Sequence, residues 1–186
     1  MNNRIPPGQR LVSRLPVLHY GPIPVFDPAS WNLRLFGLVA NEITLSYDQV
    51  TALPSKRLIT DIHCVTRWSM LDTIWEGVPV SALVEQVEPL PAAAFVVAHC
   101  DGGYTTNLPL EALLDDDVLL AFGYDDQPLP ARYGHPLRLL VPKRYLWKSA
   151  KWVRAIEFTS ADRPGFWEVR GYHNEGDPWR EERYSR

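Results

Sequence analysis

The sequence has few cysteines, no long apolar run and no strong excess of one charge, and each shortage excludes a class of protein. Two cysteines among 186 residues are too few for a disulfide framework. No apolar run approaches the roughly 20 residues that a membrane-spanning helix needs, and residues 1–10 lack the apolar segment of a secretory signal. A net charge of −3 offers no general attraction to nucleic acid. We therefore expect a cytoplasmic protein with reduced thiols, no membrane span and no nucleic-acid partner.

Proline and glycine are abundant, with 17 and 11 residues respectively, which argues against a helical bundle. A hydrophobic content of 46% suits one compact domain, and no linker-like stretch divides the chain. We expect a single domain over residues 1–186. Residues 1–30 are rich in proline and show little periodicity, so they predict an extended N-terminal arm wrapped over the body.

Alternating apolar and polar residues predict several short strands, and a few short helical patterns interrupt them. Strands are expected at 31–39, 43–46, 57–65, 95–100, 118–123, 137–141 and 151–159, and helices at 46–54, 80–87 and 108–114. Strands and helices mix without a regular strand–helix–strand rhythm. This arrangement favours an α+β fold with a mixed β-sheet, short helices and long irregular connections.

Charge is distributed unevenly along the chain. Residues 111–126 contain six acids and no base, whereas residues 132–154 contain seven bases and no acid. The basic stretch also contains Gly134, Ser149 and Ala150, small residues that let the backbone approach a ligand closely. Two solvated faces would explain the pattern, and so would a site for an anionic ligand within the basic stretch.

The two cysteines each follow a histidine, as His63-Cys64 and His99-Cys100, whereas the common phosphate-loop, dinucleotide and hydrolase motifs are absent. A zinc site of two histidines and two cysteines is one interpretation. However, both pairs lie on predicted strands, where neighbouring side chains point to opposite faces. Burial of both cysteines as small apolar residues is an equally open interpretation.

Cys64 also has features of a metal-binding thiolate. It ends a predicted strand, and Arg67 three residues later supplies the positive charge that favours a thiolate. Thiolate sulfur suits a thiophilic metal. Because one thiolate does not hold such a metal alone, the remaining ligands would have to come from a cofactor.

Four sequence blocks together resemble the molybdopterin-binding domain of sulfite oxidase-type oxidoreductases. They follow the order of that family, and the resemblance covers about residues 16–184. The blocks are His63–Ser69 with Trp75–Val78, Tyr104–Leu110, Pro136–Leu139 with Val141-Pro142 and Trp147–Val153, and Phe166–Asn174. The resemblance implies the sulfite oxidase molybdopterin-binding fold and a molybdenum–molybdopterin cofactor.

The resemblance also implies roles for individual residues. Cys64 matches the cysteine that binds molybdenum, and Tyr172 matches the active-site tyrosine beside the metal-bound oxygen. Arg67 would add positive charge for the substrate as a third catalytic residue. The implied cofactor-binding residues, besides Cys64, are His19, Tyr20, Gly21, Cys100, Tyr133, Arg138, Lys148, Ser149, Ala150 and Lys151. Trp75, Trp147 and Trp152 are expected in the core or pocket wall, because a flat pterin needs apolar surfaces.

The function that the resemblance implies is oxygen-atom transfer at molybdenum, with electrons exchanged through a partner such as a haem or flavin protein. The substrate would be a small oxyanion, as in sulfite oxidases. Leu18 stands where those enzymes carry a substrate-holding arginine, so reduction of an S- or N-oxide is an alternative. A molybdopterin-binding carrier without turnover and a zinc-binding structural domain are alternatives of other classes.

Overall fold

The computed structural model describes residues 4–185 and contains two mixed β-sheets with few, short helices. A six-stranded sheet orders its main strands β1-β5-β8-β10, with β4 beside β5 and β9 beside β8, and a five-stranded sheet is ordered β3-β2-β11-β6-β7. The strands of the first sheet are β1 (Arg10–Leu11), β4 (Lys56–Cys64), β5 (Trp68–Pro79), β8 (Leu119–Tyr124), β9 (Gln127–Pro128) and β10 (Arg138–Leu140); those of the second are β2 (Asn32–Gly37), β3 (Ile43–Ser46), β6 (Phe95–Cys100), β7 (Thr105–Pro109) and β11 (Val153–Thr159).

Three α-helices and three 3-10 turns connect the strands. They are α1 (Tyr47–Thr51), α2 (Val80–Val87), α3 (Leu110–Leu113), η1 (Asp101–Gly103), η2 (Ala131–Tyr133) and η3 (Glu168–Arg170). Ser46 caps the N-terminus of α1, because its hydroxyl accepts from Gln49 N–H while the Gln49 side chain accepts from Ser46 N–H. No helix in residues 4–185 has the length and apolar character needed to cross a membrane.

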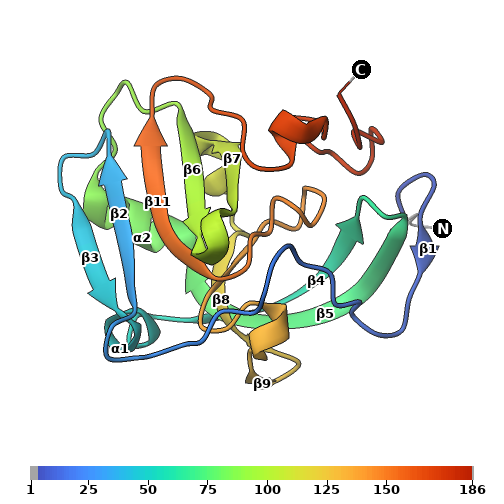
Figure 1. Cartoon of the computed structure of the whole chain (residues 1–186), viewed down its shortest axis with the longest axis horizontal. Coiled ribbons are helices and arrows are strands. Elements are labelled where there is room, and N and C mark those ends of the chain that lie inside the picture. The colour runs from blue at the N-terminus through green and yellow to red at the C-terminus, as the bar shows by residue number, and fades with distance from the viewer. Residues whose placement is uncertain (1–3, 186) are drawn as a thin grey trace.

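Both sheets combine parallel and antiparallel pairs, which confirms the predicted α+β fold with mixed sheets. β1 is parallel to β5 and β11 is parallel to β2, whereas the other pairs are antiparallel. Figure 1 shows the five-stranded sheet on one side and the β4–β5 hairpin extending to the other. The predicted ranges for β3, α2 and β6 match the observed bounds.

Three features differ from the sequence-based expectation. β5 was not predicted, because its residues are buried on both faces along much of its length and lack a clean alternation. The helix expected at 108–114 begins only at Leu110, because Thr105–Pro109 pair with β6 as the edge strand β7. Within the extended arm, Arg10 and Leu11 form a short strand. Residues 1–3 of the predicted arm lie outside the described part.

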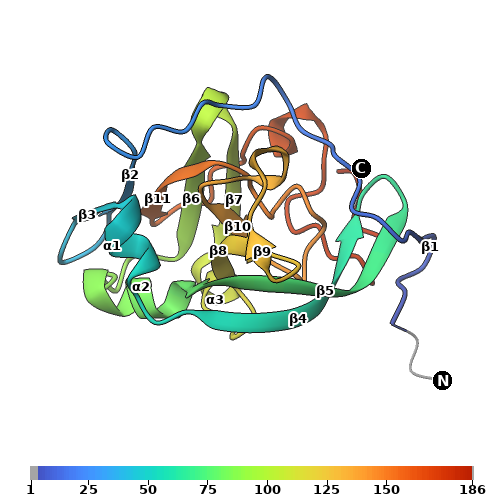
Figure 2. The ribbon, with the colours of Figure 1, turned by 90° about the horizontal axis from the view of Figure 1, so that it is seen from below.

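The buried apolar side chains form two clusters, one on each side of the β8–β10 region. The larger cluster packs α2 against the five-stranded sheet and includes Cys100. The smaller one lies between β4, β5 and the segment after β10 and includes Cys64. The arm crosses the body from β1 to β2 (Figure 2), so it closes one side of the space beside the smaller cluster.

Candidate functional site

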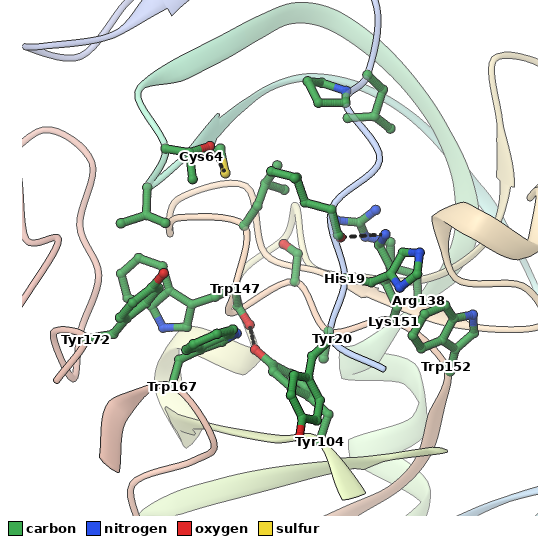
Figure 3. A pocket seen from close by; sticks show the side chains of 18 of the residues that line it. His19, Tyr20, Cys64, Tyr104, Arg138, Trp147, Lys151, Trp152, Trp167 and Tyr172 are labelled. Carbon is green, nitrogen blue, oxygen red and sulfur yellow. Dashed lines mark hydrogen bonds between the residues drawn. The ribbon is translucent and has the colours of Figure 1, made fainter. Parts of the chain in front are cut away.

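A cavity of about 310 Å³ lies beside the smaller core cluster, where six separate segments of the chain meet. The segments are the arm, the turn after β4, the start of β7, β10, the loop between β10 and β11, and the C-terminal tail (Figure 3). Its lining residues are Leu15, Pro16, Leu18, His19, Tyr20, Cys64, Val65, Thr66, Trp68, Tyr104, Arg138, Leu146, Trp147, Ser149, Ala150, Lys151, Trp152, Trp167 and Tyr172. Eight of these are residues that the sequence predicted for the site.

Cys64 is the last residue of β4, and the turn that follows brings its thiol to the cavity wall. The Arg67 amide donates to the Cys64 carbonyl over 3.1 Å and closes this turn. The Thr66 hydroxyl donates to Cys64 Sγ over 3.1 Å. Burial raises the pKa of the Cys64 thiol, while the Thr66 hydrogen bonds and the charges of Arg138 and Arg183 act in the opposite direction.

Arg138 places a buried positive charge in the same cavity. The side chain is only 3% exposed, and its guanidinium lies 5.3 Å from the ring centre of Trp75. One nitrogen donates to the Tyr133 carbonyl over 3.2 Å, but Nε has no hydrogen-bond partner among residues 4–185. Burial lowers the pKa of Arg138 to about 10. No carboxylate in the described chain pairs with this cation, so the cavity is suited to an anionic ligand.

The loop between β10 and β11 brings Ser149, Ala150 and Lys151 to the cavity next to Arg138. Lys151 Nζ donates to the carbonyls of Leu18 at 2.9 Å and Arg132 at 2.8 Å, and so ties the arm to the body. Burial and the nearby Arg138 charge lower the pKa of Lys151 to about 7. Lys151 and Arg138 also form a backbone bridge between the loop and β10. Two basic side chains therefore share one end of the cavity.

Aromatic side chains form the wall on the Cys64 side. Tyr172 stacks on Trp167 at 4.9 Å between ring centres, and it meets Trp147 edge-on at 5.0 Å. The Tyr104 hydroxyl donates to the Trp147 carbonyl. In Figure 3, Cys64 and Tyr172 lie on one side of the cavity, and Arg138 and Lys151 lie on the other. The cavity thus has an uncharged aromatic part and a cationic part.

Five predicted site residues do not line this cavity. Lys148 is buried behind it, where its ammonium pairs with Glu168 at 2.6 Å and donates to Asn107. The structure places Lys148 outside the cavity lining, because a turn between Tyr145 and Ser149 directs its side chain away from Lys151 and into the protein.

The other four lie near the site without facing it. Arg67 has φ of +68° in the turn after β4, and its exposed side chain lies beside Gly8 instead of the cavity. Cys100 belongs to the larger core cluster. The Tyr133 hydroxyl donates to the Leu15 carbonyl, which makes it a support for the arm. Gly21 follows the lining part of the arm, and its carbonyl contacts His19 Nδ1.

Besides Trp147 and Trp152, nine lining residues were not predicted for the site, and four of them carry a polar or aromatic side chain: Thr66, Trp68, Tyr104 and Trp167. All four lie inside the sequence blocks that carried the family resemblance. That resemblance is the sequence signal from which these four residues could have been predicted. Trp147 and Trp152 line the cavity as expected, whereas Trp75 is fully buried beneath Arg138.

The proposed two-histidine, two-cysteine zinc site does not form. Cys64 and Cys100 are free thiols in different core clusters. His63 contacts Ser69 at 2.8 Å, and His99 pairs with Glu157 at 2.9 Å. Residues 4–185 contain no group of three or more histidine, cysteine, aspartate or glutamate side chains that would hold a metal ion.

The cavity residues fit a metal–pterin cofactor. Cys64 offers one soft sulfur ligand, and the buried Arg138 presents an unpartnered Nε. Trp68 Nε1 is likewise buried and has no partner in the described chain. Trp147, Trp152 and Trp167 supply the apolar surfaces that a flat ring system needs.

Comparisons with known proteins agree with this geometry. Residues 20–167 match the family model of the oxidoreductase molybdopterin binding domain. The chain is 44% identical to the oxidoreductase YuiH of Bacillus subtilis, over 99% of this chain and 93% of that protein. It is 30% identical to the protein-methionine-sulfoxide reductase catalytic subunit MsrP of Gluconobacter oxydans, over 76% of this chain but only 51% of that relative.

Among solved structures, the sulfane dehydrogenase SoxCD of Paracoccus pantotrophus shares the fold, with a TM-score of 0.70 and 20% identity. The match covers 77% of this chain and 42% of the SoxCD chain. The family model and the cavity residues agree on the cofactor. The chain therefore belongs to the oxidoreductase molybdopterin-binding domain family, whose members bind a molybdopterin cofactor.

Proposed function

We propose that this protein catalyses oxygen-atom transfer at a molybdenum–molybdopterin cofactor, with Cys64 as the thiolate ligand of the metal. The observation that carries the proposal is the sharing of one cavity by the Cys64 thiol and a buried Arg138 guanidinium whose Nε has no partner in residues 4–185. When bound, the cofactor supplies the two-electron redox chemistry and the site of oxygen exchange.

The residues of the chain then hold, orient and shield the reacting groups. Thr66 orients the Cys64 sulfur through its 3.1 Å hydrogen bond. Arg138 and Lys151 bind the anionic part of the cofactor at the cationic end, with Ser149, Ala150, His19 and Tyr20 lining the same cavity. Tyr172 donates a hydrogen bond from its hydroxyl to the substrate oxygen. Trp147 and Trp167 exclude water around Tyr172.

The lining of the Cys64 side favours a neutral S- or N-oxide over an oxyanion such as sulfite. Arg138 and Lys151 are the only lysine or arginine side chains that line the cavity in the described chain, and both lie away from Cys64 (Figure 3). An oxyanion bound near Cys64 would be desolvated against aromatic rings without a paired cation, which is costly. A neutral sulfoxide would leave no charge unpaired. The name of the MsrP relative, a methionine-sulfoxide reductase, supports this substrate class.

Electrons would be exchanged with a separate haem or flavin protein, because the chain itself offers no second cofactor motif. We also propose a cytoplasmic location, in keeping with Cys64 and Cys100 both being free thiols. The alternative of another class is a protein that binds or delivers molybdopterin without turnover.

The test is metal and pterin analysis of protein made in a molybdenum-competent host, combined with a turnover screen. Methionine sulfoxide and trimethylamine N-oxide are tested with a reduced dye, and sulfite with an oxidised dye. Stoichiometric molybdenum with turnover of an S- or N-oxide agrees with the proposal. Turnover of sulfite alone overturns the substrate class, and molybdenum without any turnover favours the carrier. Zinc without pterin would exclude both.

A further inference from the structure

Side chains near both ends of the chain donate hydrogen bonds to the turn that carries Cys64. Near the N-terminus, the Gln9 side chain donates to the Cys64 carbonyl over 3.1 Å. Near the C-terminus, one Arg183 nitrogen donates to the Val65 carbonyl over 2.7 Å. Neither Gln9 nor Arg183 lines the cavity, whereas Cys64 and Val65 do. The contacts therefore fix the turn from the side opposite the cavity.

Arg183 is a buried cation with little compensation. It is 5% exposed, and its guanidinium lies 4.9 Å from the ring centre of Tyr145. A second nitrogen donates to the Pro7 carbonyl at 3.3 Å, and Nε has no partner in residues 4–185. Its nearest carboxylate, Glu181, is 3.6 Å away and has a side chain that is 44% exposed.

Burial of a cation in this way costs stability. If Arg183 served only to dock the tail, an apolar side chain of similar length would do so at lower cost. What the guanidinium does and an apolar side chain would not is hydrogen-bond two carbonyls, that of Val65 in the turn that carries Cys64 and that of Pro7 near the N-terminus.

We propose that Arg183 is a positioning residue for the Cys64 ligand, because it fixes the neighbouring Val65 carbonyl from the side opposite the cavity. We call the hydrogen bonds from Arg183 to the Val65 and Pro7 carbonyls the clamp. The clamp follows from the contacts alone, whereas the role toward the metal rests on the proposed function. Arg183 would thereby make the C-terminal tail part of the metal site without touching the cofactor or the substrate.

The clamp is tested by hydrogen exchange on the cofactor-free protein. Arg183→Met keeps the apolar stem and removes both hydrogen bonds, and Arg180→Met, a tail arginine with a side chain that is 76% exposed, is the matched control. Because a hydrogen bond from a charged donor contributes about 1.5–3 kcal/mol, amides of residues 64–67 should exchange roughly 10- to 100-fold faster in Arg183→Met. Exchange in β8 and β11 should not change, nor should the Arg180→Met pattern.

Unchanged exchange at residues 64–67, or a uniform rise throughout the protein, would overturn the clamp. If Arg183→Met does not fold, Arg183→Lys carries the same test, because one ammonium does not reproduce the bonds to both Val65 and Pro7. Faster exchange confined to residues 64–67 in that variant supports the clamp, and unchanged or uniformly faster exchange overturns it.

The positioning of the Cys64 ligand is tested on the cofactor-loaded protein through the thiolate-to-metal charge-transfer absorption band. Arg183→Met should shift this band at unchanged pterin content, because the turn no longer fixes the thiolate, whereas Arg180→Met should leave the band at the wild-type position. A band at the wild-type position in folded, loaded Arg183→Met contradicts the positioning role. Protein that contains no molybdenum would instead contradict the proposed function, and the hydrogen-exchange result would still decide the clamp.

Discussion

The Lys148 ammonium lies 2.6 Å from the Glu168 carboxylate, and both side chains are almost completely buried. The same carboxylate oxygen accepts from Trp147 Nε1 at 2.9 Å, and Lys148 also donates to the Asn107 carbonyl at 2.8 Å. In the sequence, Glu168 begins η3 directly after Trp167, whose ring stacks on that of Tyr172 in the cavity wall. This ion pair therefore joins the loop that carries Trp147 to the tail that carries the aromatic wall.

Breaking the pair should destabilise the cofactor-free protein strongly. Lys148→Met leaves the Glu168 carboxylate buried without its cation, which costs about 3–5 kcal/mol of unfolding free energy. Urea denaturation followed by far-UV circular dichroism measures this loss. The double variant Lys148→Met with Glu168→Met should recover much of it, because no unpaired charge remains. A double variant no more stable than Lys148→Met would contradict the assignment of the loss to the unpaired carboxylate.

Arg138 should behave in the opposite way, because its charge has no carboxylate partner in the described protein. Arg138→Met should leave the unfolding free energy of the cofactor-free protein unchanged or higher, since it removes an uncompensated buried cation. The same change should lower pterin content after expression in a cofactor-producing host. Pterin analysis and urea denaturation on the same preparations separate the effects. Pterin content equal to wild type would remove Arg138 from the cofactor site.

Lys151 should give the cofactor-free protein a pH-dependent stability. Its pKa is about 7 when folded and about 10.4 in an unfolded chain, so between these values the unfolded state binds more protons. The stability contribution of Lys151 therefore increases as pH rises from about 7 to about 10, and it is constant below that window. Urea denaturation between pH 6 and pH 10 should show this rise in wild type and lose it in Lys151→Met. Parallel curves for the two proteins would refute the assignment.

The contrast between Lys148 and Lys151 shows where sequence reasoning reached its limit. The basic stretch predicted an anion site, and Arg138, Ser149, Ala150 and Lys151 do line the cavity. No pattern distinguished Lys148 from Lys151, because the direction of each side chain depends on a turn held by the Lys148 amide and the Tyr145 carbonyl. The partner of Lys148, Glu168, is twenty positions away in an irregular tail without periodicity.

The fold shows a similar division. Strands with clean alternation or strongly apolar runs, such as β3 and β6, were predicted at their observed bounds. β5 was missed because a strand covered on both faces has no period-two pattern. The role of Pro109 as the residue that ends β7 and precedes α3 was also missed, since the pairing of β7 with β6 is a long-range contact.

Tyr172 should affect turnover more than cofactor binding. Its ring packs against Trp147 and Trp167, and Tyr172→Phe keeps these contacts while removing the hydroxyl. Loss of a hydrogen bond made in the transition state should lower kcat by roughly 10- to 1000-fold, with pterin content and thermal stability unchanged. Steady-state kinetics with methionine sulfoxide and a reduced dye provide the measurement. A kcat equal to wild type would exclude Tyr172 from the reaction.

The assignment of Cys64 as the metal ligand is tested most directly by the molar ratio of molybdenum to pterin in purified Cys64→Ser. Arg138 and Lys151 still hold the pterin in this variant, so pterin content should stay close to wild type, whereas activity should be lost. Molybdenum content should fall relative to pterin, because the soft sulfur ligand is gone. Wild-type molybdenum content together with full turnover in Cys64→Ser would contradict the account.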